Sequence, residues 1–149
     1  MSVVAGRLAD WLQAACGWSS LRVRCAAQAA SFTGTAVALL PLALGGAALP
    51  TAAAVASLTV SVALQGLNFS GFHSHVQDIA PQQAGVILGV TNSCGVLGGI
   101  GANLLAGQLV GSGPNGFAVM FGLTAALSAV GAAAWLAFTR GEPLRLPAY

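Results

Sequence analysis

The sequence has 149 residues, of which 56% are hydrophobic and only 5% are charged. Soluble domains carry about a quarter charged residues, so five arginines and three acidic residues are too few to cover a surface that faces water. A mean hydropathy of +0.82 is equally unsuited to a disordered segment. These values exclude a soluble domain and indicate an integral membrane protein.

The distribution of the charges supports this interpretation. No arginine, lysine, aspartate or glutamate occurs in residues 25–77 or in residues 79–139. A transmembrane helix needs about 20 mostly apolar residues, so each stretch is long enough for two crossings. The sequence therefore predicts an all-α membrane protein with four transmembrane helices.

In chain order, residues 1–25 are expected to contain the end of a preceding helix and a cytoplasmic loop. A four-helix transmembrane region follows over 26–139, and a cytoplasmic tail over 140–149. Pro41 is expected to kink the first span, and Pro50 to start the second. The predicted spans are 26–49, 51–72, 83–110 and 117–139.

The predicted connectors place all the charges on one side of the membrane. With four spans, the N-terminal segment, the polar connector 73–82 and the tail share a side, and all eight charged residues fall there. The Gly- and Pro-rich turn 111–116 and the turn near 45–50 lie on the other side and carry none. The positive-inside rule identifies the charged side as cytoplasmic.

The third span is rich in glycines four residues apart, which allow helix backbones to approach closely. We expect this helix to pack tightly against other helices, and movement against a neighbour during transport is compatible with that role. The pairs are Gly85 and Gly89, Gly95 and Gly99, and Gly107 and Gly111.

The sequence contains no constellation of catalytic residues, and we expect neither an enzyme, a cofactor, a metal site nor a nucleic-acid partner. His73 and His75 stand two apart, and we expect solvated or interfacial side chains, with a proton relay or metal ligation as the alternative. Asp78 is expected to cap the helix that begins near Pro81.

Three asparagines within the spans must face protein or water, because an unpaired amide in hydrocarbon costs several kcal/mol. Contacts between helices are the expected role of Asn68, Asn92 and Asn103. A position along a solute pathway is the alternative, most of all for Asn68 with Ser70.

Two groups of residues resemble a known family. Gly6-Arg7-Leu8-Ala9-Asp10 followed by Val23-Arg24 is similar to a loop signature of the major facilitator superfamily. Ser70-Gly71-Phe72, the block Asp78-Ile79-Ala80-Pro81 and the glycines that follow resemble the anion:cation symporter family. This family includes vesicular glutamate transporters, sialin and plant plastid phosphate transporters. The resemblance extends over nearly the whole chain.

The resemblance implies that the four spans correspond to helices 9–12 of a twelve-helix fold. The chain would then be the C-terminal fragment of a secondary active transporter for organic anions or inorganic phosphate. Such a transporter works by alternating access, as an ion-coupled symporter. The implied partners are the lipid bilayer, a small anionic solute, a coupling cation (H⁺ or Na⁺) and the missing N-terminal half.

The resemblance also assigns candidate site residues. The gating-loop candidates are Gly6, Asp10, Arg22 and Arg24. The pathway-lining candidates are Asn68, Ser70 and Asn92, and the family-motif residues are Asp78, Pro81, Gly85, Gly89 and Gly95.

Two questions stay open at this stage. The sequence does not distinguish a plastid, plasma or vesicular membrane. A small four-span structural or assembly protein without transport activity is the alternative function.

Overall fold

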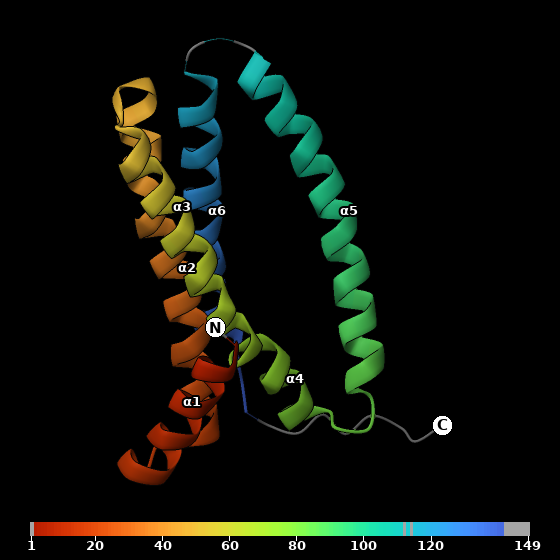
Figure 1. The fold of residues 1–149 in the computed structure, drawn as a ribbon. Helices are drawn as coiled ribbons and strands as arrows, with labels where there is room; N and C mark the ends of the chain where they lie inside the picture. Colours follow the sequence, from red (N-terminus) through yellow and green to blue (C-terminus); the bar gives the residue numbers. More distant parts are fainter. Residues whose placement is uncertain (1, 112, 114, 142–149) are drawn as a thin grey trace.

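A computed structural model describes residues 2–111, 113 and 115–141. Within these ranges the chain is helical and has no β-strand. Four segments are long and apolar enough to cross a membrane: Ser20–Gly45, Thr51–Ile79, Ala84–Gly111 and Gly116–Phe138. The predicted all-α membrane fold with four spans is therefore confirmed (Figure 1). Apart from Arg140 and Gly141, the expected tail lies outside the described residues.

Residues 1–25, expected to hold the end of a preceding helix and a loop, are mostly helical, and the loop is short. Helix α1 covers Ser2–Cys16, and α2 covers Ser20–Gly45, so α2 begins six residues before the predicted position. The turn between them uses Gly17 at a φ of 65°, and the Ser19 hydroxyl accepts the backbone N–H of Arg22 as an N-cap. The prediction started the span after the last charged residue and so left out Arg22 and Arg24. Their long side chains are compatible with a helix end, because the charged group can reach water.

Helix α2 continues through Pro41 and ends at Gly45. The short 3₁₀-helix η1 (Gly46–Ala48) then reverses the chain, and α3 (Thr51–Gln65) begins directly after Pro50. Gly46 has a φ of 48°, a conformation that favours glycine. Pro50 lies immediately before the first helical residue, close to the expected position.

The second span is longer than expected and is interrupted. After α3 come the 3₁₀-helix η2 (Gly66–Phe69) and helix α4 (Phe72–Ile79). Most of the predicted polar connector 73–82 is therefore helical, and the connection to α5 shrinks to residues 80–83. The physical reason is that α2 supplies partners for the polar groups of this segment, as described below.

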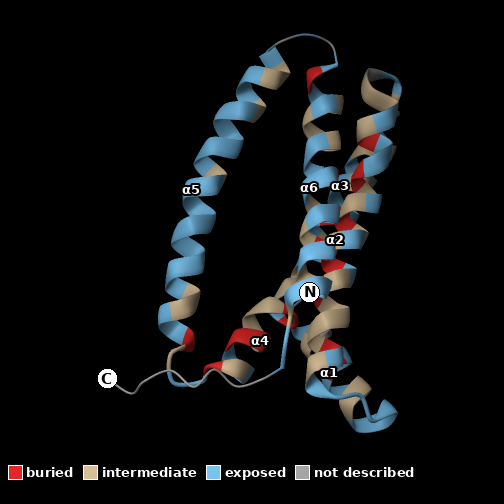
Figure 2. Ribbon diagram, turned by 180° about the vertical axis from the view of Figure 1, so that it is seen from behind, coloured by how far each residue is buried: buried red, intermediate tan, exposed pale blue. Residues whose placement is uncertain are grey.

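Helix α6 (Gly116–Phe138) packs lengthwise on α2, and α3 packs on another side of α2 (Figure 2). Leu39 and Leu42 of α2 form a small buried cluster with Ala125 of α6. Near the other end, Gly131 lies against the ring of Phe32, where a Cβ atom would be 3.4 Å from the ring. The centre of the bundle is therefore α2.

Helix α5 (Ala84–Gly111) stands apart from this bundle. It is joined to α4 at one end and to α6 at the other, and α5 and α6 move apart with distance from the turn that joins them (Figures 1 and 2). A Cβ atom added at any of its glycines, including Gly89 and Gly95, would meet nothing within 4 Å. The tight packing expected for this helix is thus not provided by the described part of the chain.

Candidate functional site

The buried polar side chains of α2 lie on one face of the helix. Arg24, Gln28, Ser31 and Thr35 follow one another at spacings of four, three and four residues, which aligns them along one side. Gln28, Ser31 and Thr35 are each at most 4% exposed. We call these four residues the α2 polar stripe. Sequence reasoning named Arg24 but overlooked the other three, although their helical spacing was a usable signal.

Gln28, in the middle of the α2 polar stripe, provides a hydrogen-bond acceptor for the backbone where the second span is interrupted. The Gln28 side-chain oxygen accepts the backbone N–H of Phe72 at 3.0 Å. Phe72 is the first residue of α4, where helical N–H groups lack an intrahelical partner. Gly71 makes the approach possible, because a Cβ atom there would lie 2.9 Å from the Gln28 Cα and closer to its side chain.

Arg24, at the end of the stripe nearest the start of α2, contacts the other end of α4. Arg24 Nε donates to Asp78 Oδ2 at 2.9 Å, and its Nη1 donates to the carbonyl of Ser70 at 3.2 Å. The Ser20 hydroxyl donates to the same Asp78 oxygen at 3.0 Å. The Arg24 side chain is 15% exposed, so this ion pair is partly shielded from solvent.

Asp78 does not have the capping role expected for it. It lies in the last turn of α4, where the helix dipole disfavours a carboxylate. Its charge is instead compensated by Arg24 and by the Ser20 hydroxyl. The expectation of an N-cap on the next helix is wrong because α4 extends up to Ile79.

Two of the three pathway candidates come together and the third does not. Asn68 lies in η2, and Ser70 is the residue directly after the end of η2. Asn68 Oδ1 and Ser70 Oγ are both buried and have no hydrogen-bond partner within the described ranges. Asn92 is exposed on α5, away from both.

The two histidines contact aromatic rings. His73 stacks on Phe69 with ring centroids 4.9 Å apart, and His75 meets the ring of Trp135 on α6 edge-on at 5.4 Å. His75 is buried, so of the two expected settings, solvated or interfacial, the solvated one is wrong for this side chain. No group of three or more potential ligands that could hold a metal ion exists among residues 2–111, 113 and 115–141.

The remaining candidates are spread over the molecule. Gly6 and Asp10 lie on α1, and Arg22 is exposed in the first turn of α2. Pro81 is exposed in the turn before α5, and Gly85, Gly89 and Gly95 are exposed along that helix. Of the four gating-loop candidates, Arg24 alone makes a side-chain contact with another candidate, Asp78.

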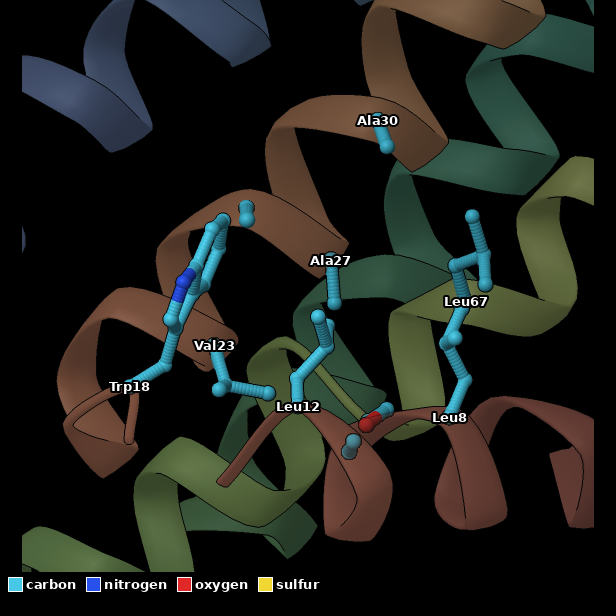
Figure 3. A pocket seen from close by; sticks show the side chains of 10 residues that line it. Leu8, Leu12, Trp18, Val23, Ala27, Ala30 and Leu67 are labelled. Carbon is cyan, nitrogen blue, oxygen red and sulfur yellow. The ribbon is translucent and has the colours of Figure 1, made fainter. Parts of the chain in front are cut away.

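A cavity of about 190 Å³ separates α1 from the start of α2. Its lining is apolar apart from Ser70, with Leu8, Leu12, Trp18 and Leu67 around it (Figure 3). An anion in this cavity would lack a cationic partner, and burying an unpaired charge is strongly unfavourable. The cavity therefore does not have the character of an anion-binding site.

The fold and the site define an all-helical, multi-pass membrane protein with an interrupted span, a feature found in transporters. No family model matches the chain. Sialin from Homo sapiens is 34% identical over 141 residues, which are 94% of this chain and 28% of sialin. Probable anion transporter 3, chloroplastic, from Arabidopsis thaliana is 34% identical over 138 residues, 93% of this chain and 26% of the relative.

A further relative is the voltage-gated purine nucleotide uniporter from Homo sapiens, which is 33% identical over 88 residues, 59% of this chain and 20% of the relative. The chain belongs to the anion:cation symporter family of the major facilitator superfamily. It spans about 28% of the length of the sialins that it matches. These relatives are transporters rather than enzymes.

The Arg24–Asp78 pair can be tested by a double-mutant cycle with Arg24→Met and Asp78→Asn. We expect a coupling energy of about 1 kcal/mol, because the pair is partly buried and charge-assisted. Unfolding in mixed detergent micelles measures it. Arg22→Met is the matched control: it lies in the same turn but is exposed, so its effect should add to that of Asp78→Asn within about 0.5 kcal/mol. Equal coupling for both arginines would contradict a specific pair.

Proposed function

We propose that the chain is the C-terminal portion of a secondary active transporter for organic anions or inorganic phosphate. The transporter works by alternating access and is coupled to H⁺ or Na⁺. The observation that carries this proposal is the match of 94% of the chain to anion transporters of which it spans only 28%. A chain of this length would form only part of such a transporter, whose substrate site lies between its two halves.

Helix α5 supports the need for a missing partner. Its 28 residues include Val86, Leu97 and Leu104, which are 68–70% exposed, beside glycines with open space around them. Without hydrophobic drive between helices in lipid, a glycine-rich face gains from close backbone contact. In the proposed transporter the N-terminal half covers this face.

The interrupted second span supports a pathway-lining role. Non-helical backbone at membrane depth occurs where protein buries it or where it lines a water-filled cavity. Here Gln28 and Arg24 cover one side of the interruption. Asn68 and Ser70 present polar groups at the same level, and Asn92 joins them from α5 when the missing half brings the helices together.

The gating role rests on the charged end of the molecule. Arg22 and Arg24 lie in the first turns of α2, Asp78 in the last turn of α4, and Asp10 on α1. Gly6 lies one turn before Asp10 on the same helix. In the transporter this end is cytoplasmic, and Asp10 pairs with basic groups or helix ends of the other half as the two halves close.

A second candidate is a four-span assembly protein without transport activity. The exposed glycine-rich face of α5 favours it, because a second copy of the chain would bury the same surface. A discrete oligomer of the 149-residue chain in native gels would support this function.

The transport proposal predicts that the native reading frame extends upstream of Met1 into further apolar spans. Reconstituted in liposomes, the protein from that frame should take up labelled phosphate or ATP when an H⁺ or Na⁺ gradient is imposed. The 149-residue chain alone should show none, since one incomplete half lacks a substrate site. A full-length cDNA and the uptake assay measure this, and a frame that starts at Met1 and yields a discrete oligomer would contradict it.

Gly95→Leu tests whether this face of α5 packs against helices of the 149-residue chain or against the missing half. In the 149-residue chain we expect no loss of thermal stability, because nothing lies within 4 Å of the added Cβ and leucine favours a helix more than glycine does. In the full-length protein the same change should destabilise by about 1–3 kcal/mol through overpacking and lower uptake. Val96→Leu is the control on another face. A full-length protein indifferent to Gly95→Leu would argue against an N-terminal half on this face.

Asp10→Asn tests the gating role. It removes one charge from an exposed position without changing the shape of the side chain. We expect the full-length protein to change its uptake rate and its distribution between inward- and outward-open states, measured by accessibility of introduced cysteines. Asp10→Asn with an unaltered rate and an unaltered distribution would rule out gating by this residue.

A further inference from the structure

The second span is interrupted, and the interruption separates a short helix, α4, from a longer one, α3. Its helical hydrogen bonding changes to 3₁₀ over Gly66–Phe69, and α4 restarts at Phe72 (Figure 1). A 3₁₀ stretch inside a long helix often marks a hinge. The interruption is therefore the natural point of bending between α3 and α4.

Helix α4 is attached to α2 at both of its ends. Gln28 accepts the N–H of its first residue, Phe72, and Arg24 pairs with Asp78 in its last turn. Because Arg24 and Gln28 are four residues apart, they lie on the same face of α2. Both attachments to α2 come from side chains of the α2 polar stripe, whereas α4 also contacts η2 and Trp135 of α6.

The contact at Gly71 resembles a pivot. Gly71 presents bare backbone to Gln28, and a Cβ atom there would be 2.7 Å from the Gln28 Cβ. With no side chain between the two backbones, α4 can rotate about this point while remaining in contact with α2.

The hydrogen bonding at the interruption is incomplete in this conformation. Ser70 Oγ and Asn68 Oδ1 are buried and lack partners within the described ranges, and Ser70 is 5% exposed. Buried polar atoms are normally paired. A different position of α4 that pairs these atoms would compensate for lost contacts elsewhere, which is the energetic condition for two alternative arrangements.

We propose that residues 66–71 are a hinge of the transport cycle and that Gln28 is the residue that positions it. By accepting the Phe72 N–H, the Gln28 oxygen holds α4 in the arrangement seen here. Breaking this hydrogen bond frees the first turn of α4 to move, while Arg24 still holds its last turn and α3 stays packed on α2. Gln28 acts through the backbone of α4 and contacts no solute. The inference rests on the proposed transport function only for the part that α4 plays in the cycle.

Hydrogen–deuterium exchange of the full 149-residue chain in lipid nanodiscs tests the positioning role without any transport assay. Gln28→Met keeps the side-chain length but lacks the acceptor, and we expect amides of residues 72–79 to exchange about tenfold faster, the loss of one ordinary hydrogen bond. Residues 51–65 should keep their rates. Gln28→Glu retains an acceptor oxygen and should preserve the rates of α4.

Ser31→Ala is the matched control, since Ser31 is buried on the same stripe and makes no contact with α4 in the hydrogen bonds seen here. It should leave α4 unchanged. Unaltered exchange of α4 in Gln28→Met would overturn the positioning role. Equal acceleration of α3 and α4 would also overturn it, because Gln28 would then be an ordinary packing residue of the α2–α3 pair.

The functional part is tested in the full-length transporter by uptake of labelled phosphate or ATP. Gln28→Met should lower the uptake rate and Gln28→Glu should restore it. Equal uptake in wild type and Gln28→Met, with faster exchange of α4, would overturn the role of the hinge in transport. Absence of uptake in the wild type would refute the proposed function and the transport role of the hinge together, while the exchange experiment still decides whether Gln28 holds α4.

Discussion

The hydrogen bond from the Phe72 N–H to Gln28 is the interaction on which the charged half of the bundle depends. A membrane offers no water to a backbone group, so an interrupted helix needs a partner for every N–H that the interruption frees. Gln28 provides one such partner from the neighbouring helix, and Arg24 provides another contact at the Ser70 carbonyl. These two side chains attach both ends of α4 to α2, and Phe69 and Trp135 contact the two histidines between them.

The chain therefore combines two packing modes that differ along its length. Near the charged end, α2 and α4 are joined by hydrogen bonds and an ion pair. Farther along, α2 and α6 contact each other through Leu39, Leu42 and Ala125. Helix α5 takes part in neither mode, although its glycines would allow a third mode, close contact between helix backbones. Its isolation agrees with the finding that the chain spans about 28% of the sialins it matches.

The sequence predicted the spans well because charge and apolar length alone decide what crosses a bilayer. The same criterion misplaced the start of α2, since Arg22 and Arg24 were treated as loop residues. It also assigned residues 73–82 to a connector, because the partners that compensate the charge of Asp78 lie 54 and 58 positions earlier in the chain. Of the site, Arg24, Ser70 and Asp78 were named. Gln28 was not, although its helical spacing from Arg24, Ser31 and Thr35 was a usable signal; its partner at Phe72, 44 residues away, could not be read from the sequence.

The turns at the uncharged end have a consequence for how the protein is made. Residues 45–50 between α2 and α3, and residues 111–116 between α5 and α6, contain no ionisable side chain. A helical hairpin inserting from the charged side must carry its turn across the hydrocarbon, and each arginine or aspartate there would add about 2.5–3.5 kcal/mol. Both hairpins are free of that barrier, so each pair of helices can enter the bilayer during synthesis as a single step.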